Sequence, residues 1–85
     1  MSVKMYTRRY CSYCVRAKQL LDELGAGYTE ISVDNDPAAL DVMKRDSGQR
    51  TVPQIWIGQT HVGGCDELMA LHRSGRLLSL LAQAG

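Results

Sequence analysis

The 85-residue sequence lacks features that would assign it to several large classes of protein. It contains no apolar run of about 18 residues, so we expect no segment that spans a membrane. Its first residues, MSVKMYTRRYC, lack the apolar core of a secretory signal. Its formal net charge is only +1, whereas a nucleic-acid-binding domain usually carries a larger basic surplus. We therefore predict a cytoplasmic protein that binds neither membranes nor nucleic acids.

Internal repeats, low-complexity tracts and interdomain linkers are also missing from the sequence. Hydrophobic residues make up 45% of the chain and charged residues 22%, which is ordinary for a globular protein. A chain of this length can bury one thin core. We therefore predict one small domain that comprises residues 1–85.

Hydrophobic periodicity and turn residues predict alternating strands and helices. In chain order, the expected elements are a strand at 3–7, a helix from Ser12 to Leu24, a strand at 28–33, a helix between Asp36 and Gly48, a strand at 52–57, a short strand within 58–64, a helix at 65–75 and a short helix at 76–83. The first two strands are joined by a helix and should be parallel. The last two are close enough in sequence to form an antiparallel hairpin. The sequence predicts an α/β fold: a four-stranded mixed sheet flanked by helices, in the order β-α-β-α-β-β-α with a short extra C-terminal helix.

Two cysteines, Cys11 and Cys14, are separated by two residues at the start of the first expected helix. Such a pair beside a βαβ pattern is typical of a thioredoxin-like redox domain. A structural zinc site needs four ligands, but His61 and His72 lie far apart on different elements, so we predict no metal site. A permanent disulfide would close too small a loop to stabilise the fold much. The pattern favours reversible thiol chemistry.

The positions of the two cysteines predict different roles. Cys11 lies at the helix N-terminus, where unpaired backbone N–H groups stabilise a thiolate. The helix contributes about 0.3–1 kcal/mol, and up to ~2 in good geometry, too little to ionise a thiol fully at neutral pH. We therefore expect Arg8, Arg9 and the S–H of Cys14 to contribute. Cys14 lies one turn inside, on the buried face, so we predict that Cys11 is the nucleophile and Cys14 the resolving thiol.

Three motifs in this order resemble the glutaredoxin family: CSYC at 11–14, TVPQIWIG at 51–58 and GGCDEL at 63–68. The chain is most similar to the small bacterial dithiol glutaredoxin 3 class, from about Val3 to Leu81. The resemblance implies a thioredoxin-like fold and a glutathione-dependent thiol–disulfide oxidoreductase that reduces protein–glutathione mixed disulfides and protein disulfides. Its implied partners are glutathione and disulfide-bearing or glutathionylated proteins, and the implied state is a monomer.

The resemblance also implies a glutathione site. In the family the Val52 position pairs with the cysteinyl part of glutathione beside a cis bond to Pro53. The start of the helix at Cys65 and Asp66 receives the γ-glutamyl group. The implied glutathione-binding residues are Arg8, Tyr13, Thr51, Val52, Pro53, Gly64, Cys65 and Asp66.

Several alternatives remain open at this stage. Gln49 and Arg50 compete with Arg8 for the glycyl carboxylate of glutathione. The Cys65 side chain is more typical of a small buried hydrophobic residue than of a third redox thiol, and Trp56 is more typical of a core residue than of a ligand platform.

The main departure from the family pattern is Ser12, because proline is commonest at this place. Some glutaredoxins with CSYC hold a [2Fe–2S] cluster between two subunits, so the resemblance permits such a cluster, although no permanently bound cofactor is predicted.

Two other functions compete with the glutathione-dependent enzyme. One is a glutaredoxin-like protein that thioredoxin reductase reduces, and the other is a non-enzymatic iron–sulfur carrier.

Overall fold

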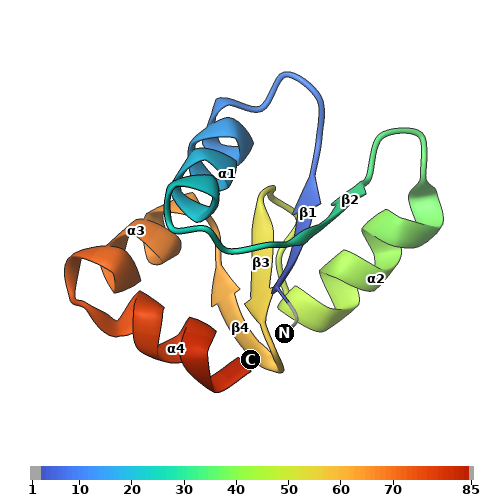
Figure 1. Cartoon of the computed structure of the whole chain (residues 1–85). Helices are drawn as coiled ribbons and strands as arrows, with labels where there is room; N and C mark the ends of the chain where they lie inside the picture. The colour runs from blue at the N-terminus through green and yellow to red at the C-terminus, as the bar shows by residue number, and fades with distance from the viewer. Residues whose placement is uncertain (1–2, 85) are drawn as a thin grey trace.

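A four-stranded sheet with helices on both faces forms the framework of the protein (Figure 1). This computed structural model describes residues 3–84. The elements are β1 (Val3–Thr7), α1 (Ser12–Glu23), β2 (Thr29–Ser32), α2 (Pro37–Ser47), β3 (Gln54–Ile57), β4 (Thr60–Gly63), α3 (Cys65–Arg73) and α4 (Arg76–Ala84). The predicted order of elements is confirmed. No helix in this part of the chain is long and apolar enough to cross a bilayer.

The sheet has the strand order β2-β1-β3-β4. β1 and β2 are parallel, as predicted for two strands joined by a helix. β3 pairs with β1 and with β4 in antiparallel fashion, which confirms the predicted hairpin. Both central strands, β1 and β3, are covered on two sides, since α2 lies on one face and α1, α3 and α4 lie on the other (Figure 1).

The core consists of two layers, one on each face of the sheet. Ile55 and Ile57 belong to the layer under α1, α3 and α4, whereas Trp56 belongs to the layer under α2. This division follows from the alternation of side chains along a strand, and it confirms Trp56 as a core residue. Each fully buried aliphatic side chain stabilises the fold by about 1.5–3 kcal/mol.

Helix α2 begins and ends at the predicted residues. Asp36 is its N-cap and accepts the Ala39 N–H at 3.0 Å, and Pro37 occupies the first helical position. Gly48 ends the helix with φ of +71°, a conformation that glycine adopts at little cost.

The predicted strand at 52–57 is too long, because the ladder begins only at Gln54. Pro53 has no N–H to donate to a neighbouring strand, so the preceding segment remains a loop. The Val52–Pro53 bond is cis, as the family resemblance implied. The helix predicted at 65–75, with Gly75 as its stop, is α3, which ends at Arg73. Ser74 is its C-cap, and Gly75 follows with φ of +79°.

Candidate active site

The sulfur of Cys11 lies at the N-terminal end of α1. Cys11 is the N-cap residue, and its Sγ accepts the backbone N–H of Cys14 at 3.1 Å. The sulfur therefore takes the place that a serine or aspartate oxygen occupies at an ordinary helix start. There it meets the partial positive charge of the helix N-terminus, which favours a thiolate. A backbone N–H makes this contact, as expected for a sulfur at a helix N-terminus.

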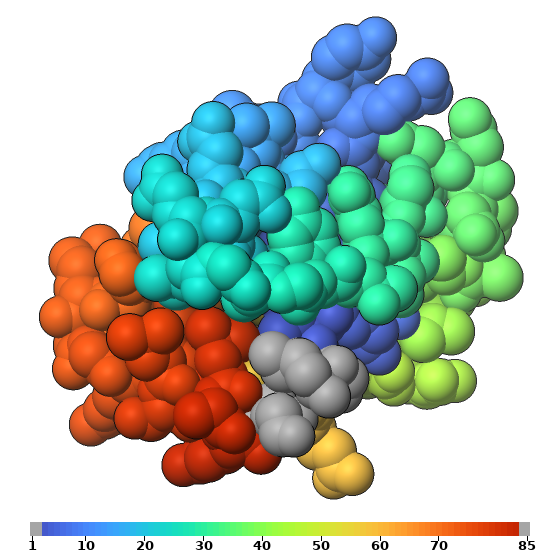
Figure 2. Space-filling model, viewed as in Figure 1, coloured from blue at the N-terminus to red at the C-terminus, as the bar shows by residue number. Residues whose placement is uncertain are grey.

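The turn between β1 and α1 presents Cys11 at the surface. The segment that follows β1 projects from the body of the protein (Figure 2). Tyr10, the residue before Cys11, is fully exposed and has φ of +56°, which is uncommon for a residue other than glycine. This left-handed residue redirects the chain from the strand into the helix start.

Cys14 is buried, with an exposed fraction of 1%. Burial, followed by a hydrogen bond with Cys11, raises the pKa of Cys14 to about 12. The backbone N–H of Arg8 and the charge of Lys18 act in the opposite direction on this pKa. The predicted lower exposure of Cys14 is confirmed.

The two arginines before Cys11 have different surroundings. The Nε of Arg9 lies 3.5 Å from Oδ2 of Asp34, and the Arg9 backbone N–H donates to the same oxygen at 2.7 Å. Its charge is therefore partly neutralised by Asp34, so Arg9 contributes less to a thiolate at Cys11 than predicted. Arg8 is exposed.

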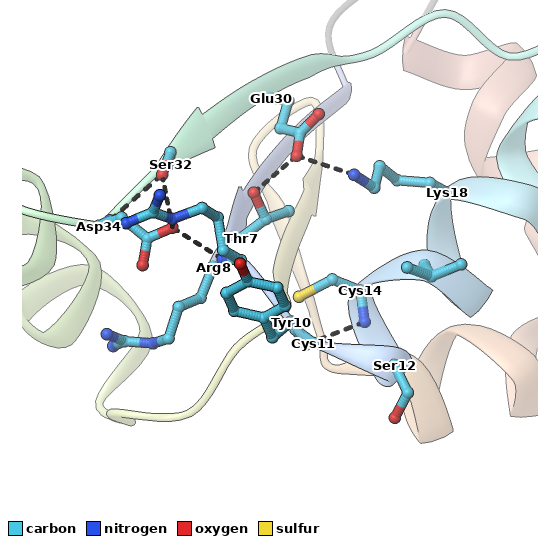
Figure 3. Close-up of a pocket in the computed structure, with 12 residues that line it drawn as sticks. Thr7, Arg8, Tyr10, Cys11, Ser12, Cys14, Lys18, Glu30, Ser32 and Asp34 are labelled. Carbon is cyan, nitrogen blue, oxygen red and sulfur yellow. Dashed lines mark hydrogen bonds and ion pairs between the residues drawn. The ribbon is translucent and has the colours of Figure 1, made fainter.

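Two hollows flank the cysteine pair. The α1–β2 hollow, of about 650 Å³, is shown in Figure 3 and is lined by Thr7, Arg8, Arg9, Tyr10, Cys11, Ser12, Cys14, Val15, Lys18, Glu30, Ser32 and Asp34. The α3 hollow, of about 380 Å³, is lined by Tyr13, Gln49, Thr51, Val52, Pro53, Gln54, Gly64, Cys65, Asp66 and Glu67. Cys11 lies between them, since its Sγ is 3.9 Å from the carbonyl oxygen of Val52.

The α3 hollow brings together all but one of the residues that the family resemblance implied for glutathione. The exception is Arg8, which lines the α1–β2 hollow on the other side of Cys11. Gln49 lines the α3 hollow, but Arg50 does not. Cys65 is 3% exposed, and burial raises the pKa of its thiol, which fits the predicted small hydrophobic residue.

Two glycines leave room for the Glu67 carboxylate at the start of α3. Gly63 has φ of +112°, and a Cβ on this residue would lie 2.9 Å from the Glu67 carboxylate. A Cβ on Gly64 would lie 3.4 Å from the backbone oxygen of Pro53. The Glu67 carboxylate accepts the Gly64 N–H at 2.6 Å and so caps the helix. We had not predicted this role for Glu67.

Gln54 is a second site residue that we had not predicted. Its side chain is 1% exposed, and its Nε2 donates to the Thr51 backbone oxygen at 3.0 Å and to Oε1 of Gln49 at 3.3 Å. Its Oε1 lies 2.8 Å from Nε2 of His61. This amide therefore connects the loop before Pro53 to strand β4. A glutamine inside an otherwise apolar strand was the available signal, because a buried amide needs partners.

No group of three or more histidine, cysteine or acidic side chains that could hold a metal ion occurs among residues 3–84. His61 contacts Gln54, and His72 is exposed on α3. A [2Fe–2S] cluster would therefore need ligands from outside the described chain.

Comparison with known proteins identifies the family. The model of the glutaredoxin family matches residues 3–62. The chain belongs to the glutaredoxin family. This is a family of oxidoreductases, and membership agrees with a mixed sheet that carries an N-capping cysteine before α1.

Glutaredoxins from several organisms resemble the chain over nearly its whole length. A glutaredoxin of Pseudomonas aeruginosa is 52% identical over 80 residues, which cover 94% of this chain and 95% of that one. The solution structure of a Brucella melitensis glutaredoxin has 49% identity and a TM-score of 0.85, over 95% of this chain and 88% of that one. A buckwheat glutaredoxin solved in complex with glutathione has 41% identity and a TM-score of 0.91, over 98% of this chain and 78% of that one. The thioredoxin-like fold is therefore confirmed.

Proposed function

We propose that this chain is a glutathione-dependent thiol–disulfide oxidoreductase that reduces protein–glutathione mixed disulfides and protein disulfides. One observation carries the proposal: the partly exposed sulfur of Cys11 lies at a helix N-terminus and 3.9 Å from the Val52 carbonyl, at the edge of the α3 hollow. The buckwheat glutaredoxin that was solved with glutathione supports the choice of co-substrate. We also propose that the protein acts as a monomer in the cytoplasm.

The α3 hollow has the chemistry that glutathione requires. Glutathione is a short peptide with two carboxylates and one ammonium group. The N-terminal N–H groups of α3 at Cys65 and Asp66 are suited to receive the γ-glutamyl carboxylate. The exposed Asp66 carboxylate is suited to pair with the ammonium. The Val52 backbone lies beside the Cys11 sulfur, where the cysteinyl part of glutathione must lie for sulfur exchange.

The reduction of a mixed disulfide uses Cys11 alone. The Cys11 thiolate attacks the glutathione sulfur, the bond to the target breaks, and the target leaves as a thiolate that takes a proton. A second glutathione thiolate then attacks the glutathione held on Cys11. Oxidised glutathione forms, and Cys11 leaves as a thiolate, so each turnover consumes one free glutathione and releases one reduced target.

The reduction of a protein disulfide uses both cysteines. Cys11 attacks one sulfur of the target, and Cys14 then attacks Cys11, which releases the reduced target and leaves a Cys11–Cys14 disulfide. Glutaredoxins have reduction potentials of roughly −200 to −230 mV, so a glutathione pool can reduce this disulfide again.

One coupled assay tests the proposal. The substrate is the mixed disulfide of glutathione and hydroxyethanethiol, with glutathione, glutathione reductase and NADPH as the reducing system. We expect activity from the wild type and from Cys14→Ser, and none from Cys11→Ser. Activity that requires thioredoxin reductase in place of glutathione would instead support the competing electron donor.

A further inference from the structure

A partly exposed ion pair lies behind Cys14, outside the proposed glutathione site. The Nζ of Lys18 is 3.0 Å from Oε2 of Glu30, and the side chains are 30% and 40% exposed. The hydroxyl of Thr7, a buried residue, donates to the same oxygen at 2.7 Å. Three elements therefore hold this pair in place: α1 supplies Lys18, β2 supplies Glu30 and β1 supplies Thr7.

The sequence spacing places the lysine close to Cys14. Residues four apart on a helix lie on the same face, with Cβ atoms about 5–6 Å apart. Cys14 and Lys18 both line the α1–β2 hollow, and Figure 3 shows the Lys18 amine directed toward Glu30 beyond Cys14. The hydrogen bond to Glu30 raises the pKa of Lys18, so the side chain stays cationic.

The resolving step requires Cys14 to be negatively charged, and the surroundings of Cys14 disfavour that charge. Cys14 must become a thiolate before it attacks, although burial and the hydrogen bond with Cys11 raise its pKa to about 12. Once Cys11 is in a mixed disulfide, its sulfur carries no charge that repels a Cys14 thiolate. Burial then remains as the main obstacle. The backbone N–H of Arg8 and, to a smaller extent, the charge of Lys18 act against it.

We propose that Lys18, held by Glu30 and Thr7, is a positioning residue that stabilises the Cys14 thiolate during resolution of the Cys11 mixed disulfide. This inference rests on the dithiol route of the proposed function. In that step the Cys14 sulfur bonds to the Cys11 sulfur, and the bond between Cys11 and the target breaks. The target sulfur leaves with the electron pair and takes up the proton that Cys14 has lost, while Lys18 keeps its own proton.

The alternative is an ion pair that only joins α1 to β2. Exposed pairs of this kind contribute about 0–1 kcal/mol to stability. A structural role would affect all reactions of the protein through its folding. The proposed role affects only the step that uses Cys14, which makes the two readings distinguishable.

The experiment follows the reaction of reduced protein with a symmetric aromatic disulfide whose released thiolate is coloured. Attack by Cys11 releases one equivalent in a phase whose rate depends on reagent concentration. Attack by Cys14 on the mixed disulfide releases the second equivalent in a phase whose rate is independent of reagent concentration. The Cys14→Ser variant lacks the second phase, and it also records any release that Cys65 causes.

Lys18→Met should slow the second phase roughly three- to tenfold and leave the first unchanged. The effect is modest because water screens the Lys18 charge and the Glu30 carboxylate, 3.0 Å from its Nζ, partly offsets it. Lys18→Arg, which keeps the charge, should restore most of the rate. Arg16→Met removes an equal charge from an exposed position on the same helix and should change neither phase.

Three outcomes would overturn the inference. They are an unchanged second phase in Lys18→Met, equal slowing of both phases, and equal slowing of the second phase in Lys18→Met and Lys18→Arg. A failure of the proposed function looks different, because the wild type would then lack activity with glutathione in the coupled assay, whatever Lys18 does to the second phase.

Discussion

The backbone N–H of Cys14 donates to the Sγ of Cys11 at 3.1 Å, while the Cys14 side chain is itself buried. One cysteine is thus presented at a helix start, and the other supports it from within the helix. This relationship gives the two thiols different access to solvent.

Alkylation should therefore distinguish the two cysteines. In Cys11→Ser, we expect iodoacetamide to modify Cys14 at least roughly a hundredfold more slowly than free cysteine at pH 8. Burial is the largest cause that raises the pKa of Cys14, and it remains in this variant, so little of the thiol is ionised at that pH. Mass spectrometry of the modified peptide measures the rate, and Cys14→Ser provides the comparison. Faster modification of Cys14 than of Cys11 would reverse the assignment of roles.

Removal of the Asp66 carboxylate should weaken the binding of glutathione. We expect Asp66→Ala to raise the KM for glutathione roughly three- to tenfold with little change in kcat, because one charge pair contributes about 1 kcal/mol. The coupled assay measures both constants. Asp41→Ala removes an exposed acid from α2 and should leave the KM unchanged. An equal rise in both variants would show a general charge effect and count against the site.

Loss of the Gln54 amide should loosen the loop before Pro53. Gln54→Leu leaves Nε2 of His61 and the Thr51 backbone oxygen without their partner. Thr51 is exposed and His61 is partly exposed, so the cost for the two groups together should be about 1 kcal/mol, at the low end for an unpaired polar group. Urea unfolding should show this loss, and the KM for glutathione should rise. Gln59→Leu makes the same change at an exposed position and should alter neither the stability nor the KM for glutathione. Wild-type stability in Gln54→Leu would contradict the positioning role of this amide.

The Glu30 carboxylate should stabilise the fold in a pH-dependent manner. The Thr7 hydroxyl and then Lys18 lower the pKa of Glu30 below its ordinary value. A lowered pKa contributes stability that is present above the unfolded pKa of about 4.3 and is lost as the pH falls through the folded pKa. Glu30→Gln should therefore be less stable than wild type by about 0.5–1 kcal/mol at pH 7, as for an exposed pair.

Urea unfolding at several pH values measures this difference, which should shrink toward zero near about pH 3. Asp41→Asn removes an exposed acid that does not contact Lys18 and serves as the control. A difference that grows on acidification would have the wrong sign for a carboxyl with a lowered pKa.

Local sequence patterns predicted the order of the helices and strands correctly, because the start and end of each element depend on neighbouring residues. The N-cap at Asp36, the stop at Gly48 and the alternation around Trp56 depend on neighbouring residues alone. The same holds for Cys11, whose place before α1 follows from the helix pattern after it. The strand at Gln54 was misplaced by two residues, since the missing N–H of Pro53 prevents pairing that an apolar pattern suggests.

The composition of the site was predicted less completely, because its contacts join distant segments. The Cys11 sulfur and the Val52 carbonyl are 41 residues apart in sequence. The family resemblance predicted that Val52 lies beside Cys11. It also assigned Arg8 to the glutathione site, although Arg8 lines the other hollow. The Lys18–Glu30 pair had no counterpart in the motifs, since it depends on how α1 packs over the β1–β2 ladder.

The sequence by itself determined the order of helices and strands, the pair of thiols at a helix start and the family, because periodicity, caps and motifs are properties of short segments. Only the tertiary structure decided which side of Cys11 each side chain occupies and which buried polar groups meet. These contacts depend on strand order and register, which bring Thr7, Lys18 and Glu30 together at one oxygen atom behind Cys14.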